Sequence, residues 1–278
     1  MPSRRAGRLR VVVVALVLAG CGVAYGVWRA RVRPAARPLD EARPSWPAPV
    51  PSEAASADSP VAGVSDPPPP HAETLEDLIT GLERNPDQPE AWHRLGLAYR
   101  RQGEAEAEGG MDPRPAYEKS AAALGESQAR LPGREETLNA LGEVYQLLAA
   151  EEGARGGDVR PVLAGAIATF DNAIGWALGN SVAYLWRGNL HMRLGEAEAA
   201  AGVDARESFK EAVMDFTRAS NMDRTAWKAF ANRGLAYEKL EEWDMAVSSY
   251  EAALRIVGDA FPPLEEWLAK ARARQGGR

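Results

Sequence analysis

Residues 230–254, FANRGLAYEKLEEWDMAVSSYEAAL, decide the fold that this sequence predicts. Apolar and small side chains recur at i, i+4 and i+7 in each half: Phe230, Gly234 and Tyr237, then Ala246, Tyr250 and Ala253. This spacing places each set on one face of a helix. Glycine inside a helix costs about 1 kcal/mol relative to alanine, so Gly234 indicates a close approach of two backbones. The stretch therefore predicts an antiparallel helix pair joined by a short turn at Glu241-Glu242.

The same pattern returns three times toward the N-terminus, at a step of 46 residues. The large residue that opens the first helix recurs as Trp92, Leu138, Tyr184 and Phe230, and the glycine four residues later as Gly96, Gly142, Gly188 and Gly234. A large apolar residue of the second helix recurs as Leu78, Leu124, Phe170 and Phe216. One step shared by independent positions is typical of a repeat array.

These residues carry a resemblance to the tetratricopeptide repeat family. Trp92-x2-Leu95-Gly96-x2-Tyr99 is similar to the first-helix pattern of that family, and Ala212-x3-Phe216-x2-Ala219 to its second helix. The resemblance covers residues 74 to about 275. It implies an all-α fold, a solenoid of helix pairs wound as a right-handed superhelix. The family repeat is about 34 residues long, whereas three repeats here have 46 and only the last has the family length.

We expect three regions: an N-terminal anchor at 1–33, a disordered linker at 34–72 and a repeat domain at 73–275. The repeat domain divides into a half repeat at 73–88, repeats at 89–134, 135–180, 181–226 and 227–260, and a capping helix at 262–275. The additional residues of each long repeat fall between its two helices. We expect them to lengthen both helices by similar amounts.

Three Asp-x-Arg sequences mark the junctions inside the long repeats: Asp112 to Arg114, Asp158 to Arg160 and Asp204 to Arg206. Glycines precede each of them. Because glycine ends helices and aspartate caps helix starts, this pattern predicts the end of one helix and the start of the next. Glu207, three residues after Asp204, predicts a capping box. A metal or anion site is disfavoured, since one carboxylate per repeat without histidine or cysteine makes a poor ligand set.

The charge is distributed unevenly. Residues 1–43 contain nine arginines and two acidic residues, and the remainder contains 24 basic and 37 acidic residues. An acidic domain argues against a nucleic-acid partner. The chain has one cysteine, Cys21, so it forms no internal disulfide.

Residues 11–28, VVVVALVLAGCGVAYGVW, carry no charge and have arginines on both sides. They fit a transmembrane anchor of minimal length. They also fit an export signal, because Leu18-Ala19-Gly20-Cys21 resembles the cleavage box of bacterial lipoproteins, with Cys21 as the lipidated residue. Both readings attach the chain to a membrane. Arginines on both sides leave the orientation of a transmembrane anchor open, and we expect the repeat domain on the extracytoplasmic side, in the cell envelope. Residues 34–72 contain eleven prolines, which predicts an extended spacer.

No catalytic motif is present in the sequence: it lacks a phosphate-binding loop, His-Glu-x-x-His, Gly-x-Ser-x-Gly and paired cysteines. His191 holds a position that is tyrosine in the other repeats, which indicates a packed core residue. We expect His93, after Trp92, to face outward. We therefore expect no enzymatic activity, no cofactor, no metal and no small-molecule substrate.

The resemblance implies a concave face lined by first helices, on which a protein or peptide partner binds. The candidate binding residues are His93, Leu97, Arg100, Asn139, Glu143, Leu185, Asn189 and Lys228. The two asparagines can donate to and accept from a peptide backbone, and Leu97, Leu185, Met192 and Leu235 can receive apolar side chains. The resulting hypothesis is a membrane-tethered scaffold or adaptor. The alternatives are a structural subunit of an envelope assembly and a chain that oligomerises through its own repeats.

Overall fold

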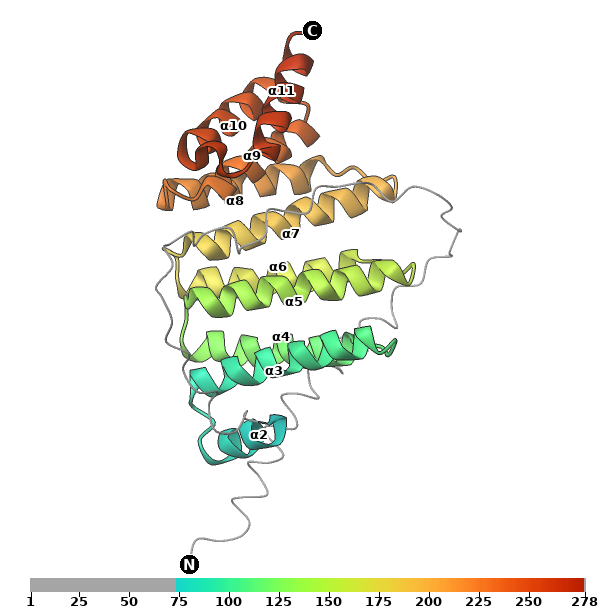
Figure 1. Ribbon diagram of the computed structural model, residues 1–278, viewed down its shortest axis with the longest axis vertical. Coiled ribbons are helices and arrows are strands. Elements are labelled where there is room, and N and C mark those ends of the chain that lie inside the picture. The colour runs from blue at the N-terminus through green and yellow to red at the C-terminus, as the bar shows by residue number, and fades with distance from the viewer. Residues whose placement is uncertain (1–73, 278) are drawn as a thin grey trace, which may run out of the picture. The chain divides into compact units, whose positions relative to one another are not determined.

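The computed structural model describes residues 74–277, and all its regular elements in that range are helices (Figure 1). They are α2 (Leu75–Arg84), α3 (Pro89–Glu108), α4 (Arg114–Arg130), α5 (Glu135–Ala154), α6 (Arg160–Trp176), α7 (Ser181–Ala200), α8 (Arg206–Met222), α9 (Trp227–Lys239), α10 (Trp243–Val257), the 3₁₀ turn η1 (Gly258–Ala260) and α11 (Pro263–Gln275). The prediction of an all-α chain is confirmed for these residues. The predicted anchor, 1–33, and linker, 34–72, lie outside them.

The helices form four antiparallel pairs, α3–α4, α5–α6, α7–α8 and α9–α10, each with a first and a second helix. The first helices begin at Pro89, Glu135, Ser181 and Trp227, so each start lies 46 residues after the previous one. The three long first helices have 20 residues against 13 in α9, whereas the long second helices have 17 against 15 in α10. The expectation of equal lengthening is therefore wrong. Most of the additional length lies in the first helices.

The long first helices end in glycines with left-handed backbone conformation. Gly110, Gly156 and Gly202 have φ between 69° and 72°. The N–H of the residue after each glycine bonds back to a carbonyl five residues earlier, as from Val203 to Glu198 at 2.8 Å. These bonds satisfy carbonyls that the helix end would leave unpaired. In the short pair Glu241 takes this place with φ 60°, a conformation that costs a residue with a Cβ free energy.

Each Asp-x-Arg sequence lies at the start of a second helix. Its aspartate lies one residue before the capping residue of that helix, as Asp158 lies before Val159. The Oδ1 atom of Asp158 accepts a hydrogen bond from the backbone N–H of Arg160 at 3.1 Å, and Arg160 returns an ion pair from Nη2 to Oδ2 at 2.8 Å. Val159 is the capping residue of α6 and makes no side-chain bond. The predicted capping box of Asp204 and Glu207 is wrong, because Ala205 caps α8 and also makes no side-chain bond. The pattern is thus structural: all three aspartates accept from the backbone N–H two residues on, and at Asp112 and Asp158 the arginine side chain also pairs with the carboxylate.

The described helices belong to two compact units, one that ends at Arg130 and one that begins at Leu131. In the first unit, α2, α3 and α4 enclose Leu82, Leu95 and Leu124, none of which has any exposed surface. A Cβ at Gly96 would lie 2.5 Å from the side chain of Leu124. Gly96 therefore allows α3 and α4 to pack at a distance that alanine would prevent.

In the second unit, the rings of Phe170, Phe216 and Tyr250 are fully buried in the core. A Cβ at Gly188 would meet the ring of Phe216 at 2.6 Å, and one at Gly234 would meet Tyr250 at 2.5 Å. These contacts confirm the prediction of close approach at the repeated glycines. α11 ends the unit by burying Leu264, and its Trp267 ring lies 6.1 Å from that of Tyr250.

Within residues 74–277, none of the helices has the length and the apolar composition needed to cross a membrane.

Candidate partner-binding face

The predicted binding residues lie on first helices of both units. In the first unit, His93 is buried, with 9% of its surface exposed, so the expectation that it faces outward is wrong. Leu97 and Arg100 are half-buried. Arg100 points its Nε toward Glu104 Oε1 at 3.3 Å. Of these three positions, Leu97 and Arg100 retain surface for a partner.

In the second unit, all five predicted residues are half-buried, neither fully enclosed nor fully exposed. They are Asn139 and Glu143 on α5, Leu185 and Asn189 on α7, and Lys228 on α9. Two apolar positions expected beside them are not available, because Met192 and Leu235 are 6% and 7% exposed. Leu185 is therefore the apolar residue of this set that a partner can reach.

The two asparagines are held by residues of the next first helix along the chain. Asn139 Oδ1 accepts from Trp186 Nε1 on α7 at 2.8 Å, and Asn189 Oδ1 accepts from Asn232 Nδ2 on α9 at 2.8 Å. Both asparagines thus use their oxygen inside the protein. Their Nδ2 donors make no hydrogen bond within residues 74–277. Sequence reasoning placed both residues on this face but missed the bonds, because the partners occupy a position that differs in type from repeat to repeat.

Lys228 lies near the start of α9, with its Nζ 5.9 Å from the centre of the Trp227 ring. Burial lowers the pKa of Lys228. Further along α9, Glu238 is closed off by Tyr250, which donates to Oε1 at 2.8 Å, and by Lys270 of α11 at 2.9 Å from Oε2. The accessible part of the face in this unit therefore lies on α5, α7 and the first turn of α9.

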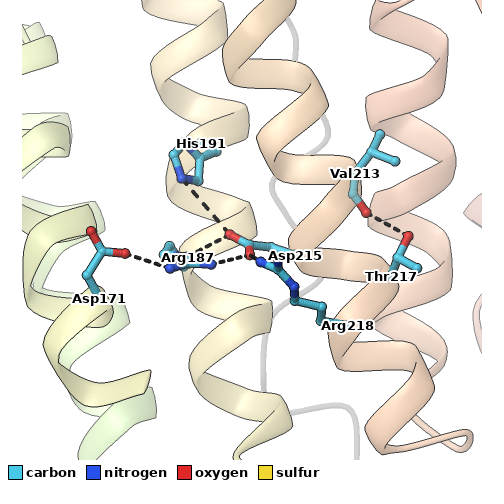
Figure 2. A network of polar contacts seen from close by, with 7 residues as sticks. All are labelled: Asp171, Arg187, His191, Val213, Asp215, Thr217 and Arg218. Carbon is cyan, nitrogen blue, oxygen red and sulfur yellow. Dashed lines mark hydrogen bonds and ion pairs between the residues drawn. The ribbon is translucent and has the colours of Figure 1, made fainter. Parts of the chain in front are cut away.

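A partly buried polar network links α6, α7 and α8 (Figure 2). Arg187 donates from Nε to Asp215 Oδ2 at 2.8 Å and from Nη1 to Asp171 Oδ1 at 2.6 Å. The side chain of Asp215 has no exposed surface, and that of Asp171 is 53% exposed. These charge-assisted bonds raise the pKa of Arg187, chiefly through Asp215. The arginine is therefore ionised and neutralised within the protein.

His191 borders the network, with Nε2 4.0 Å from Asp215 Oδ2 and with a buried Nδ1 that has no hydrogen-bond partner. Burial lowers the pKa of His191, although Asp215 acts in the opposite direction. The histidine is largely but not fully buried, with 15% of its side chain exposed, at the packed position that its place in the repeat predicted. The network itself was missed by sequence reasoning. The signal was present, because Arg187 occupies the position that is Leu95 and Leu141 in the earlier repeats.

Within residues 74–277, no three side chains of histidine, cysteine, aspartate or glutamate come together in a way that could hold a metal ion. In the second unit, the first helices offer two amide donors, the half-buried Leu185 and charged residues. Such a set can bind a peptide or a protein surface by hydrogen bonds and apolar contact.

Residues 229–263 match the tetratricopeptide repeat family model. The chain thus carries a tetratricopeptide repeat in α9 and α10, and the resemblance predicted from the sequence is confirmed there. The 46-residue helix pairs lie outside the matched segment. No curated protein sequence matches the chain.

Several solved structures are similar to the described helices. The crystal structure of MamA protein is 17% identical over 66% of this chain and 81% of its own, with a TM-score of 0.45. TTC0263, a thermophilic TPR protein from Thermus thermophilus, is 19% identical over 72% of this chain and 89% of its own, with a TM-score of 0.45. YrrB, a TPR protein with an unusual peptide-binding site, is 16% identical over 72% of this chain and 100% of its own, with a TM-score of 0.33.

Proposed function

We propose that this chain is a non-catalytic scaffold or adaptor that binds a protein or peptide partner on its first-helix face. The observation that carries the proposal is the pair of amide donors at Asn139 and Asn189. Each oxygen is held by the next first helix, so each Nδ2 is fixed in direction before a partner arrives. A preorganised donor loses less conformational entropy on binding than a free side chain.

The surroundings of these donors suit an extended peptide. Asn189 lies one helical turn from Leu185, so an apolar contact and an amide donor stand side by side on α7. Glu143 and Lys228 add charges of both signs on the neighbouring first helices. A right-handed stack of the helix pairs, as the family resemblance implies, would place these groups along one continuous wall.

The proposal includes attachment to a membrane, through residues 11–28 as a transmembrane helix or through a lipid on Cys21. Its support is the sequence: an uncharged run flanked by arginines, and the only cysteine at the end of a lipoprotein-like box. The proline-rich spacer of residues 34–72 would then hold the repeats up to about 120 Å from the membrane, on the extracytoplasmic side.

The partner is tested with the full-length chain as bait in membrane extracts, followed by affinity measurements on the captured protein. Asn139→Asp and Asn189→Asp keep an oxygen for Trp186 and Asn232 but replace the outward donor with an acceptor. Together they should weaken binding about tenfold or more, equivalent to about 1.4 kcal/mol. Asn172→Asp, the same change at an exposed position of α6, is the matched control. Equal affinity of the double variant and the wild type would place recognition elsewhere.

The anchor is tested by mass spectrometry and membrane partition of the wild type and Cys21→Ser. If a lipid on Cys21 is the anchor, the wild type carries an acyl group, and the Cys21→Ser variant is lost from the membrane fraction. An unacylated wild type that remains in the membrane after substitution indicates a transmembrane span. A soluble, uncleaved wild type contradicts both forms of the proposal.

A second candidate function is self-association or assembly into a larger structure. Three exposed apolar side chains, at and near the end of α6 and on the loop that precedes α5, favour it. Trp176 and Leu178 are 52% and 69% exposed at the end of α6, and Leu131 is 42% exposed. The two loops are joined, because Asn180 Nδ2 donates to Gly133 O at 2.7 Å. Light scattering of the full chain at several concentrations tests this candidate, with Leu178→Asp expected to dissociate any oligomer. A monomer at all concentrations excludes it.

A further inference from the structure

Two arginines, Arg187 and Arg233, hold the same position in successive first helices. Each is three residues after the aromatic that opens its pattern and directly precedes a packed glycine. In the two earlier pairs the position is Leu95 and Leu141, which have no exposed surface. A guanidinium group has therefore replaced a core leucine twice in the second unit.

Arg187 is neutralised by two carboxylates of this chain. Asp215, on the second helix of the same pair, is fully buried, whereas Asp171, on the preceding second helix, remains half exposed. Asp171 of α6 and Asp215 of α8 thus approach the guanidinium from opposite sides (Figure 2).

The corresponding places around Arg233 carry no charge. The glycine contacts fix the register, because Gly188 faces Phe216 and Gly234 faces Tyr250, so Ser249 corresponds to Asp215. Thr217 corresponds to Asp171, since each lies 46 residues from the other in helices of equal length. Thr217 lies on the side of α8 turned away from Arg187, and its hydroxyl donates to Val213 O at 2.7 Å (Figure 2).

Arg233 makes only uncharged contacts. Its Nε donates to Ser249 Oγ at 3.1 Å, and its guanidinium lies 5.2 Å from the centre of the Phe230 ring. No carboxylate of residues 74–277 pairs with it within 4.0 Å. The group is half-buried, and this burial lowers the pKa of Arg233, opposed only by Tyr237. A half-buried cation without a counter-ion destabilises the protein, and an external carboxylate would relieve that cost.

We propose that Arg233 is the centre of a second binding site, between α8, α9 and α10, for an aspartate or glutamate side chain of a protein partner. The incoming carboxylate takes the place beside Arg233 that Asp171 takes beside Arg187. The planar guanidinium matches a carboxylate with two parallel hydrogen bonds, which gives both strength and direction.

The surroundings favour an acidic residue flanked by apolar ones. Met245, one turn before Ser249 on α10, is 48% exposed, and Met214, three residues before Thr217 on α8, is 42% exposed. Flexible methionine side chains adapt to apolar residues of a partner. The net negative charge of the chain outside residues 1–43 disfavours a strongly acidic ligand, so we expect a single carboxylate in an apolar segment.

The test uses a fluorescently labelled peptide with one glutamate between leucines, acetylated and amidated so that the side chain is its only carboxylate. Its binding to the full-length chain is followed by fluorescence anisotropy. We expect saturable binding that weakens about tenfold or more when glutamate is replaced by glutamine. Arg233→Leu, which restores the residue type of the earlier pairs, should remove the difference between the two peptides.

Ser249→Asp supplies the carboxylate that Asp215 supplies to Arg187. This variant should raise the unfolding temperature and weaken the glutamate peptide about tenfold or more, whereas Ser248→Asp, the same change at the exposed neighbouring position, should leave binding within about twofold. Asn139→Asp should leave this peptide unaffected, which separates the site from the first-helix face. Equal binding of both peptides, no effect of Ser249→Asp, or displacement by inorganic phosphate but not by acetate would overturn the proposal.

Discussion

Trp186 donates a hydrogen bond from its indole Nε1 to Asn139 Oδ1 at 2.8 Å, and thereby joins α7 to α5. The same ring lies against Gly142, where a Cβ would come within 2.1 Å of it. At Gly96, Gly188 and Gly234 the facing side chain comes from the second helix of the same pair. In the α5–α6 pair, the side chain that faces Gly142 is instead Trp186, which belongs to α7 of the next pair.

Asn139→Ala should therefore destabilise the protein, because it leaves the indole N–H of a buried tryptophan without an acceptor. We expect the free energy of unfolding to fall by about 1–3 kcal/mol. Asn139→Asp retains an oxygen at the same place and should cost clearly less. Urea denaturation at neutral pH measures both. Equal losses would mean that the bond contributes nothing to stability.

Gly234→Ala should destabilise α9 against α10, because the new Cβ would meet the Tyr250 ring at 2.5 Å. Overpacking of this kind costs about 1–3 kcal/mol. The matched control is Gly165→Ala on α6, where no atom lies within 4 Å of the new Cβ. There the helix propensity of alanine should instead stabilise the protein by up to about 1 kcal/mol. Thermal unfolding of the two variants should thus shift in opposite directions.

These glycines show how far the sequence predicted the fold. The repeated step placed every first helix, and the glycine four residues after each opening residue predicted the close packing that Gly188 and Gly234 display. The distribution of the additional length was not predictable, because glycine and aspartate mark the ends of the junction but do not say how many residues each helix gains. The offset of Asp158 from the capping position likewise depends on the turn conformation, which spacing alone does not specify.

The candidate site was less predictable than the fold. Family offsets placed Asn139 and Asn189 on the first-helix face, but burial of His93 and Met192 depends on how closely the neighbouring helix packs. The arginines at Arg187 and Arg233 broke the apolar pattern visibly. The difference between their surroundings depends on which residues of the second helices face each arginine, and the spacing of the sequence does not specify this.

Glu241→Gly should stabilise the protein. Glu241 has φ 60°, the conformation that glycine provides at the equivalent helix ends in the longer pairs. Removing the Cβ relieves a strain of about 1 kcal/mol. Glu241→Ala is the matched control, since it removes the side chain beyond the Cβ and keeps the strain. A gain in urea midpoint for alanine equal to that for glycine would show that the side chain, and not the backbone, sets the effect.

His191 should make stability depend on pH. Burial lowers its pKa in the folded protein, against the opposing effects of Asp215, Glu211 and Asp171 and with the support of Arg187. The unfolded chain therefore binds the proton more readily than the folded protein does. The contribution of neutral His191 to stability is complete above its pKa in the unfolded chain, about 6.5, and is lost as pH falls through its lower pKa in the folded protein. His191→Tyr, the residue type of the other repeats, should lose less stability than the wild type between neutral pH and mildly acidic pH. Parallel losses in both proteins would assign the dependence to other groups.

Removing one partner of the Arg187–Asp215 ion pair should lower the free energy of unfolding far more than replacing both partners by apolar residues. Asp215→Ala leaves a guanidinium in the core with only the half-exposed Asp171 as counter-ion, and we expect a loss of about 3–5 kcal/mol. Arg187→Leu with Asp215→Ala reproduces the residues of the first pair, Leu95 and Ala123, which both have no exposed surface. Because an apolar contact then replaces two desolvated charges, the double variant should match or exceed the wild type in urea unfolding. A double variant no more stable than Asp215→Ala would show that the core around α8 requires the charges themselves.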